Sequence, residues 1–365
     1  MKQLICTVIT LSLTALLFGQ QSVTTDIKTT FNSQVPGLLK KSNTPGLAIA
    51  VIQDGKLIFE KGFGFANVED QKEITSTTGF NIGSISKTFT AWGIMKLVED
   101  GKLDLDTPIS KYLSRWDLPT SKYNVDRVTI RAILNHTAGL SVHGYPGFSK
   151  ASQLPSLEES LNGKNGAVRD DEKVELIYEP QTKFKYSGGG YTILQLIIEE
   201  VTGTSFSSYM ESTIFGPLQM KNTSFALTPN IMKHSATPYN EEGDEMYMVR
   251  FTAQAAAGLQ TTLEDLILFA NANLKENPVL SAKSMSVITT PTALANNDYA
   301  LGYMVMDRFG FRMTGHAGSN DGWQSGMMFA LDSDAAIILL SNGSNGKKVL
   351  MPCLQMWAQW HKNQL

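Results

Sequence analysis

Apolar residues come in short runs near both ends of the chain and follow helical spacing in its middle. Residues 46–65 carry two apolar runs around Asp54-Gly55, a dipeptide that favours a two-residue hairpin turn. From Tyr299 onward the pattern returns to short apolar runs divided by Gly, Asn and Asp. We therefore predict strands near both termini.

The middle of the chain is predicted to be mainly helical. From Ile85 to Gly101 apolar residues recur at spacings of three and four, which indicates an amphipathic helix that ends at the glycine. Further helices are predicted over 128–136, 190–202, 261–274 and 349–360. Strands at both ends with helices between them predict an α+β fold, in which the N- and C-terminal strands form one antiparallel sheet flanked by helices, with a mainly helical second lobe. A small-molecule site is expected in a cleft between the lobes.

The first 20 residues have the pattern of a secretory signal peptide. Lys2 precedes an uncharged apolar run from Leu4 to Phe18. At about 15 residues this run is shorter than the roughly 20 that a membrane-spanning helix needs. We therefore predict that residues 1–20 are removed, that the protein is exported to the periplasm or the extracellular space, and that it has no stable membrane insertion afterwards. Residues 21–365 are predicted to form a single domain of two interleaved lobes.

Charge and cysteine content exclude several classes of function. Lys and Arg number 31 against 34 Asp and Glu, a net charge of −3, so no basic excess indicates a nucleic-acid partner. Loss of the signal peptide would leave Cys353 as the single cysteine, which excludes an internal disulfide. The five histidines form no HExxH pattern and have no paired-cysteine cluster beside them, so we predict no metal site. The oligomeric state stays open.

Ser84-Ile85-Ser86-Lys87 is an SxxK tetrad at the start of the first predicted helix. Helical residues three apart share a face, so the Lys87 amine, when neutral, is placed to remove the Ser84 hydroxyl proton. Backbone N–H groups at the helix N-terminus suit a developing oxyanion. The alternative is an N-cap serine with a solvent-facing lysine. A second tetrad, from Ser344 to Lys347, lies in a Gly- and Asn-rich turn without a helix behind it and is interpreted as a solvated loop.

Two later motifs strengthen the functional interpretation of the Ser84 tetrad. Tyr186 precedes three glycines, where the backbone can approach a ligand closely, and lies 102 residues after Ser84. His316, 130 residues further on, lies in a His-x-Gly motif on a predicted strand. Taken singly, Tyr186 is typical of a buried aromatic residue and His316 of a satisfied polar one. His136 belongs to a helix-ending segment, for which a structural role is predicted rather than membership of a Ser-His-Asp triad.

In this order and spacing, the three motifs resemble those of the penicillin-recognising serine hydrolases. The nearest branch comprises class C β-lactamases, D-alanyl-D-alanine carboxypeptidases, D-aminopeptidases and related esterases. The resemblance covers roughly residues 35–360. Supporting segments are GKLDLDTP at 101–108, VTIRAILNHTAGL at 128–140, FGPLQMKNT at 215–223 and AAGLQTTLEDL at 256–266.

The resemblance implies roles for individual residues. Ser84 would be the acylated nucleophile and Lys87 its proton acceptor, while Tyr186 would exchange protons with the leaving group and with the deacylating water. The backbone N–H groups of Ser84 and Ser319 would form the oxyanion hole. His316 would stand where relatives have the first residue of Lys-Thr-Gly or His-Thr-Gly. No cofactor is implied.

Two departures from the family pattern concern substrate binding. Gly188 replaces the Asn of Tyr-x-Asn, whose amide holds the substrate carbonyl in relatives. His316-Ala317-Gly318 replaces Lys-Thr-Gly, and an ordinary histidine with a pKa near 6.5 is largely neutral at pH 7. Gly188 and Gly318 remain candidate substrate-binding positions, but a fixed cation for a substrate carboxylate is missing from this motif.

The leading hypothesis is an exported serine peptidase that acts on D-amino-acid peptides of the cell-wall type. The alternatives are an esterase for small acyl esters, a class C-like β-lactamase, and a penicillin-binding receptor without turnover. All of them imply a small-molecule or short-peptide ligand. The walls of the pocket are expected from loops near 137–170 and 235–250.

Overall fold

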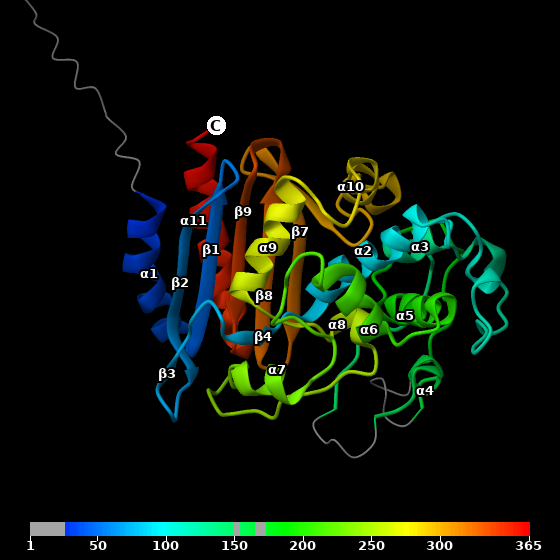
Figure 1. The fold of residues 1–365 in the computed structure, drawn as a ribbon, viewed down its shortest axis with the longest axis horizontal. Helices are drawn as coiled ribbons and strands as arrows, with labels where there is room; N and C mark the ends of the chain where they lie inside the picture. The colour runs from blue at the N-terminus through cyan, green and yellow to red at the C-terminus, as the bar shows by residue number, and fades with distance from the viewer. Residues whose placement is uncertain (1–25, 149–153, 165–172) are drawn as a thin grey trace, which may run out of the picture.

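A seven-stranded antiparallel sheet brings the two ends of the chain together (Figure 1). The computed structural model describes residues 26–148, 154–164 and 173–365, and the predicted signal peptide lies outside them. The strand order is β3-β2-β1-β9-β8-β7-β6, so β1 from the start of the chain pairs with β9 from its end. The strands are β1 Gly46–Gln53, β2 Lys56–Asn67, β3 Lys72–Glu73, β6 Met304–Arg308, β7 Phe311–Asn320, β8 Trp323–Ala330 and β9 Ala335–Ser341. The predicted α+β class is confirmed.

The hairpin between β1 and β2 forms where the sequence predicts it. Gln53 pairs with Lys56, which leaves Asp54 and Gly55 as the two turn residues. Their φ angles are 51° and 63°, the left-handed values that a type I′ turn requires. Asp and Gly adopt such angles at low cost, so this turn sets the register of the first strand pair.

The strands at the centre of the sheet are apolar on both faces because both faces are covered. In β1, Leu47, Ile49 and Val51 belong to one buried cluster, while Ala48 and Ala50 belong to the other. This division follows from the alternation of side chains along a strand. The continuous apolar run of β1 is therefore the sequence signature of a strand between two layers.

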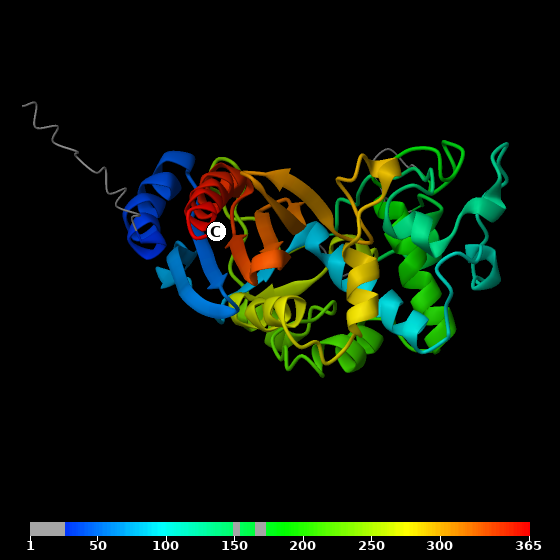
Figure 2. The same ribbon diagram turned by 90° about the horizontal axis from the view of Figure 1, so that it is seen from above.

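Two helices from opposite ends of the chain cover one face of the sheet (Figure 2). They are α1, Ile27–Ser42, and α11, Lys347–Lys362. Phe31 of α1 and Trp357 of α11 are fully buried beneath them. The helix predicted over 349–360 is confirmed with slightly wider bounds, whereas the strand and helix patterns did not predict α1.

The remaining helices lie on the other face of the sheet and beyond its β7-β6 end (Figure 1). A two-stranded pair, β4 Gly79–Asn81 and β5 Gln260–Thr262, leads into this part. The helices are α2 Ser86–Glu99, α3 Ile130–Leu134, α4 Leu157–Leu161, α5 Gly188–Thr202, α6 Phe206–Met210, α7 Pro229–His234, α8 Gln254–Ala257, α9 Leu263–Leu274 and α10 Ala282–Thr289. Within the described ranges, no helix has the length and apolar character needed to cross a membrane.

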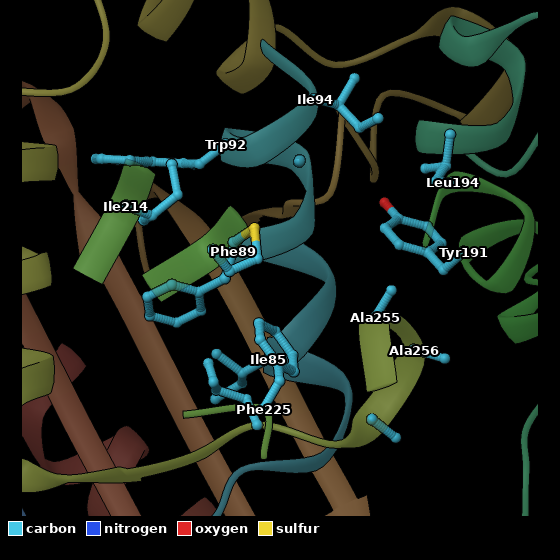
Figure 3. Packing of buried hydrophobic residues seen from close by; sticks show 14 of the residues in the cluster. Ile85, Phe89, Trp92, Ile94, Tyr191, Leu194, Ile214, Phe225, Ala255 and Ala256 are labelled. Atoms are coloured by element: carbon cyan, nitrogen blue, oxygen red, sulfur yellow. The ribbon is translucent and has the colours of Figure 1, made fainter. Parts of the chain in front are cut away.

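Helix α2 is buried nearly all round, which corrects the prediction that it is amphipathic. Figure 3 shows Phe89 and Trp92 on one side of it and Ala255, Ala256 and Tyr191 on the other. The ring of Phe89 lies 4.0 Å from that of Phe269, measured between centroids. The polar residues of α2 that the pattern placed toward solvent have partners inside the protein instead. Thr88 donates to the Gly302 carbonyl at 2.8 Å and Thr90 to that of Ala255 at 3.1 Å.

Candidate active site

Ser84 lies in a short 3-10 turn, η1 Gly83–Ile85, that runs directly into α2. The turn is held on the far side from the cleft, where Ser86 donates to the Gly83 carbonyl at 2.6 Å and accepts from the Leu259 N–H at 3.0 Å. Ser84 itself is half-buried, between buried neighbours on both sides. The bonds of Ser86 therefore leave the Ser84 hydroxyl facing the cleft on a rigid support.

Lys87 is a buried amine beside the Ser84 hydroxyl, and its side chain is only 2% exposed. Its Nζ donates to Ser84 Oγ at 3.2 Å and to the Ala256 carbonyl of α8 at 2.6 Å. Among the described residues, no carboxylate lies within 4.0 Å of this nitrogen. The solvent-facing lysine of the alternative interpretation is therefore wrong, and the Ser84-Lys87 contact predicted from their spacing is present.

Tyr186 reaches the same place from the segment before α5. The Lys87 Nζ lies 4.9 Å from the centroid of its ring. His136 packs behind the ring at 4.2 Å between centroids and accepts a hydrogen bond from the Ser187 N–H at 3.1 Å through Nδ1. His136 is buried and does not line the cleft, so it supports Tyr186, in agreement with its predicted structural role.

The glycines after Tyr186 face other protein segments, so a side chain at these positions would meet protein atoms. A Cβ atom on Gly188 would lie 2.9 Å from the His143 carbonyl oxygen, and the Gly188 N–H donates to that oxygen at 3.0 Å. Gly188 lines neither cavity at Ser84. The candidate substrate-binding role of Gly188 stays a prediction. The missing side chain at Gly188 makes room for the loop that carries His143.

His143 is a cleft residue to which the sequence analysis gave no role. Its imidazole lies 5.0 Å from the Tyr186 ring and lines the cavity with Ser84 and Lys87. Partial burial, followed by the charges of Lys87 and Lys185, lowers the pKa of His143 below its ordinary value. The preceding residue, Val142, has a φ of 57°, which is rare for a β-branched residue. The signal for this position was a histidine just after the HTAGL segment, in a loop predicted to form a pocket wall.

A chain of hydrogen bonds connects His136, Tyr299 and His316 with one consistent direction. Since His136 Nδ1 accepts from Ser187, its Nε2 carries the proton and donates to the Tyr299 hydroxyl at 3.2 Å. That hydroxyl donates to His316 Nε2 at 2.9 Å. His316 Nδ1 then donates to the Ala317 carbonyl at 2.6 Å. Every donor in the chain has an acceptor when both imidazoles are neutral.

The electrostatics of this chain keep both imidazoles uncharged. Burial, reinforced by the charge of Lys87, lowers the pKa of His316 to about 3. Burial also places the pKa of His136 well below its ordinary value, with Lys87 as the next cause. Both effects favour the neutral His316 that the sequence analysis expects at pH 7. Protonation of Nε2 would also remove the acceptor of the Tyr299 hydroxyl proton, so the neutral His316 provides no cation for a substrate carboxylate.

Strand β7 packs against the nucleophile turn so closely that glycine is required on both sides. Gly83 has a φ of 50°, and a Cβ atom on it would lie 2.7 Å from the Ser319 backbone nitrogen. A Cβ atom on Gly318 would lie 1.9 Å from the Ile82 carbonyl oxygen. This contact places the backbone of Ser319 beside that of Ser84, where the predicted oxyanion hole requires it.

Two cavities open at Ser84, and Tyr186 and Ser319 line both of them. The first measures about 350 Å³ and is bordered by polar groups of Lys87, His143 and the segment after Ser319. The second measures about 530 Å³ and extends from His316 along the face of the sheet that α11 covers. The predicted wall near 137–170 is present in the described residues from 143 to 146, but described residues of the 235–250 loop line neither cavity.

The second SxxK tetrad does have a helix behind it, which corrects the sequence analysis. The turn η8, Ser344–Gly346, leads into α11 at Lys347, just as η1 leads into α2. The two tetrads differ in their surroundings. The Ser344 hydroxyl accepts from the Gly322 N–H at 2.9 Å, and Lys347 is exposed. The turn-to-helix geometry alone therefore does not identify a candidate nucleophile. Burial of the lysine is what distinguishes the Ser84 tetrad from the Ser344 tetrad.

In the described residues, no group of three or more His, Cys, Asp and Glu side chains is arranged to hold a metal ion. Cys353 lies buried in α11, where burial raises the pKa of its thiol to about 12.

The fit between β7 and η1 predicts a large cost for any side chain at position 318. Gly318→Ala should lower the free energy of unfolding by about 1–3 kcal/mol, because the new methyl group overlaps the Ile82 carbonyl. Unfolding in guanidinium chloride measures this difference in the free energy of unfolding. Gly326→Ala on β8 is the matched control, since its nearest neighbour would be a Leu350 methyl at 3.9 Å. Equal stability of the two variants would contradict the proposed fit.

The depressed pKa of His316 predicts lower stability in acid. Unfolded chains bind a proton at this residue below about pH 6.5, whereas the native protein does so only near pH 3. Stability is thus fully present above pH 6.5 and falls as the pH decreases through this window. Between pH 7 and pH 5, His316 should account for a loss of about 2 kcal/mol.

Urea unfolding at the two pH values tests this expectation. His316→Gln should show a smaller decrease than the wild type by about that amount, whatever its stability at pH 7. His234→Gln replaces an exposed histidine and should keep the full decrease. Identical pH dependence in wild type and His316→Gln would show that His316 is not held neutral.

Comparisons with known proteins agree with the fold. A family model described as Beta-lactamase matches residues 31–351. The chain is 28% identical over 321 residues to Protein flp of Staphylococcus aureus (strain N315), covering 83% of this chain and 61% of that protein. It is also 28% identical over 314 residues to Penicillin-binding protein 4* of Bacillus subtilis (strain 168), covering 80% of this chain and 67% of that protein.

A solved structure gives the same result in three dimensions. The octameric penicillin-binding protein homologue from Pyrococcus abyssi superposes with a TM-score of 0.77 at 26% identity, over 90% of this chain and 77% of that one. The chain spans 61% of the length of Protein flp, so whole-protein properties do not transfer directly. The family match covers most of the chain and the fold agrees with it, and the protein therefore belongs to the beta-lactamase family, among homologues of penicillin-binding proteins.

Proposed function

We propose that the protein is an exported serine hydrolase that forms an acyl-enzyme at Ser84 and acts on uncharged esters or amides. The observation that carries the proposal is the Lys87 amine, buried and 3.2 Å from the Ser84 hydroxyl at the N-terminus of α2. Family membership supports hydrolase chemistry in general. Export rests on the sequence of residues 1–20 alone and stays a prediction.

Acylation follows from the positions of three groups. Ser84 Oγ attacks the carbonyl carbon of the substrate while its proton passes to Lys87, which must first have released the proton of its charged form. The oxygen of the tetrahedral intermediate lies between the backbone N–H groups of Ser84 and Ser319. Collapse of the intermediate breaks the bond to the alcohol or amine, which leaves with a proton delivered through the Tyr186 hydroxyl.

Deacylation reverses these proton transfers with water as the nucleophile. Tyr186 takes a proton from the attacking water, and the second tetrahedral intermediate uses the same two N–H groups. The C–O bond to Ser84 then breaks, its oxygen regains a proton from Lys87, and the acid is released.

The neutral His316 changes the order of the two leading hypotheses. Peptide C-termini and penicillins carry a carboxylate, which a cation in the third motif would bind. Because His316 accepts from Tyr299 and stays uncharged, this contact is missing. Ester hydrolysis needs no such anchor and is therefore placed first. Hydrolysis of D-amino-acid peptides is kept as the second candidate because two relatives are named as penicillin-binding proteins or their homologues.

Intact mass after mixing with a fluorophosphonate and, separately, with a fluorescent penicillin tests the nucleophile. We expect a stoichiometric fluorophosphonate adduct in the wild type and none in Ser84→Ala, together with a loss of ester hydrolysis of about 10³-fold or more. Ser344→Ala is the matched control from the second tetrad and should label normally. An adduct that survives Ser84→Ala would refute the assignment. A persistent penicillin adduct would favour the peptidase candidate instead.

Replacement of the phenol tests proton transfer by Tyr186. Tyr186→Phe should lower kcat for ester hydrolysis about 10²-fold, because the ring and its packing stay while the relay is lost. Tyr247→Phe, at a tyrosine that is 82% exposed, is the control. Ser187→Ala would be a poor control, since the Ser187 hydroxyl caps α5 at Gly190 N and is buried. Unchanged kcat in Tyr186→Phe would remove this residue from the mechanism.

A further inference from the structure

We propose that the second cavity at Ser84 is a subsite for an apolar, uncharged leaving group, so that the preferred substrates are esters or amides of aliphatic alcohols or amines. This inference rests on the proposed function and specifies its substrate class. The cavity measures about 530 Å³ and contains Ser84, Tyr186 and His316 at its inner end. It is thus continuous with the reacting groups.

The cavity exists because α11 does not fill the whole face of the sheet. Small residues lie side by side on that face, since Ala317 of β7 pairs with Gly326 of β8. A Cβ atom on Gly326 would meet only a Leu350 methyl group, at 3.9 Å. The glycine is half-exposed although its strand is central in the sheet. The absence of side-chain volume at Gly326 therefore leaves the space open.

The walls of the cavity are apolar. They include Met304, Met306, Met328, Leu350 and Leu354, from β6, β8 and α11. Methionine side chains adapt to ligands of different shape, and leucines provide fixed apolar surface. Lys347 is the single charged residue among the described lining residues and is exposed. Such a lining favours alkyl or aromatic groups and disfavours buried charge.

The position of the cavity assigns it to the leaving group. His316 lines only this cavity and Lys87, which takes the proton of Ser84, lines only the polar one, whereas Tyr186 borders both. Under the proposed mechanism Tyr186 protonates the departing oxygen or nitrogen, so the group attached to that atom extends from Tyr186 past the neutral His316. An uncharged imidazole at this point is compatible with an alkyl chain and offers no partner to a carboxylate.

Two matched ester series test the assignment. In acetates of methanol, butanol and octanol only the leaving group lengthens, while in methyl acetate, methyl butyrate and methyl octanoate only the acyl group does. We expect kcat/KM to rise about tenfold or more from methyl to butyl acetate, because each buried methylene contributes to binding. The acyl series should change less than about threefold. A rise confined to the acyl series would overturn the assignment.

Gly326→Val fills the cavity without touching the reacting groups. It should remove the preference for butyl over methyl acetate, with fluorophosphonate labelling measured in parallel to show that Ser84 is still reactive. Gly326→Ala adds less volume and should give an intermediate preference. If Gly326→Val keeps the full preference for butyl acetate, the cavity is not the subsite.

Direct binding separates this inference from the proposed function. Calorimetric titration of wild-type protein with 1-octanol should give saturable binding that Gly326→Val loses, whether or not Ser84 is active. Binding without ester hydrolysis or fluorophosphonate labelling would refute the serine hydrolase mechanism but retain an apolar site. Equal heats for wild type and Gly326→Val would overturn the site itself.

Discussion

The burial of α2 is the constraint on which the rest of the site depends. The helix is enclosed by aromatic rings on one side and by α8 and Tyr191 on the other, and its threonines donate to backbone carbonyls of neighbouring segments. A helix held in this way cannot rotate or slide without breaking several contacts at once. Its N-terminal turn therefore holds Ser84 in place, and the same burial brings the Lys87 amine to the Ala256 carbonyl.

The catalytic cleft combines one buried amine with uncharged neighbours. His136, Tyr299 and His316 form a hydrogen-bonded chain whose direction is set by backbone groups at both ends, the Ser187 N–H and the Ala317 carbonyl. Because both ends are fixed, neither imidazole can accept a proton without losing a bond. These hydrogen bonds thus leave the side of the cleft at His316 without a positive charge. Under the proposed function, substrate recognition falls to backbone N–H groups and to the apolar surface beside α11.

Several features of the fold and the site could be predicted from local sequence. The Asp54-Gly55 hairpin follows from turn chemistry, and the Ser84-Lys87 contact follows from helical spacing. Other predictions failed because local pattern carries no information about what packs outside an element. Helix α2 was expected to be amphipathic but is buried nearly all round, which depends on the segments that pack against it.

The sequence alone determined the family, since the order and spacing of the SxxK, Tyr-Ser and His-x-Gly motifs indicated it. Tertiary structure decided which of two SxxK tetrads has a buried lysine, and that the His316 imidazole is occupied by Tyr299. Both depend on contacts between residues far apart in the chain. A lysine loses contact with water, and a histidine loses its proton, only when other segments close around them, and no local pattern records that closure.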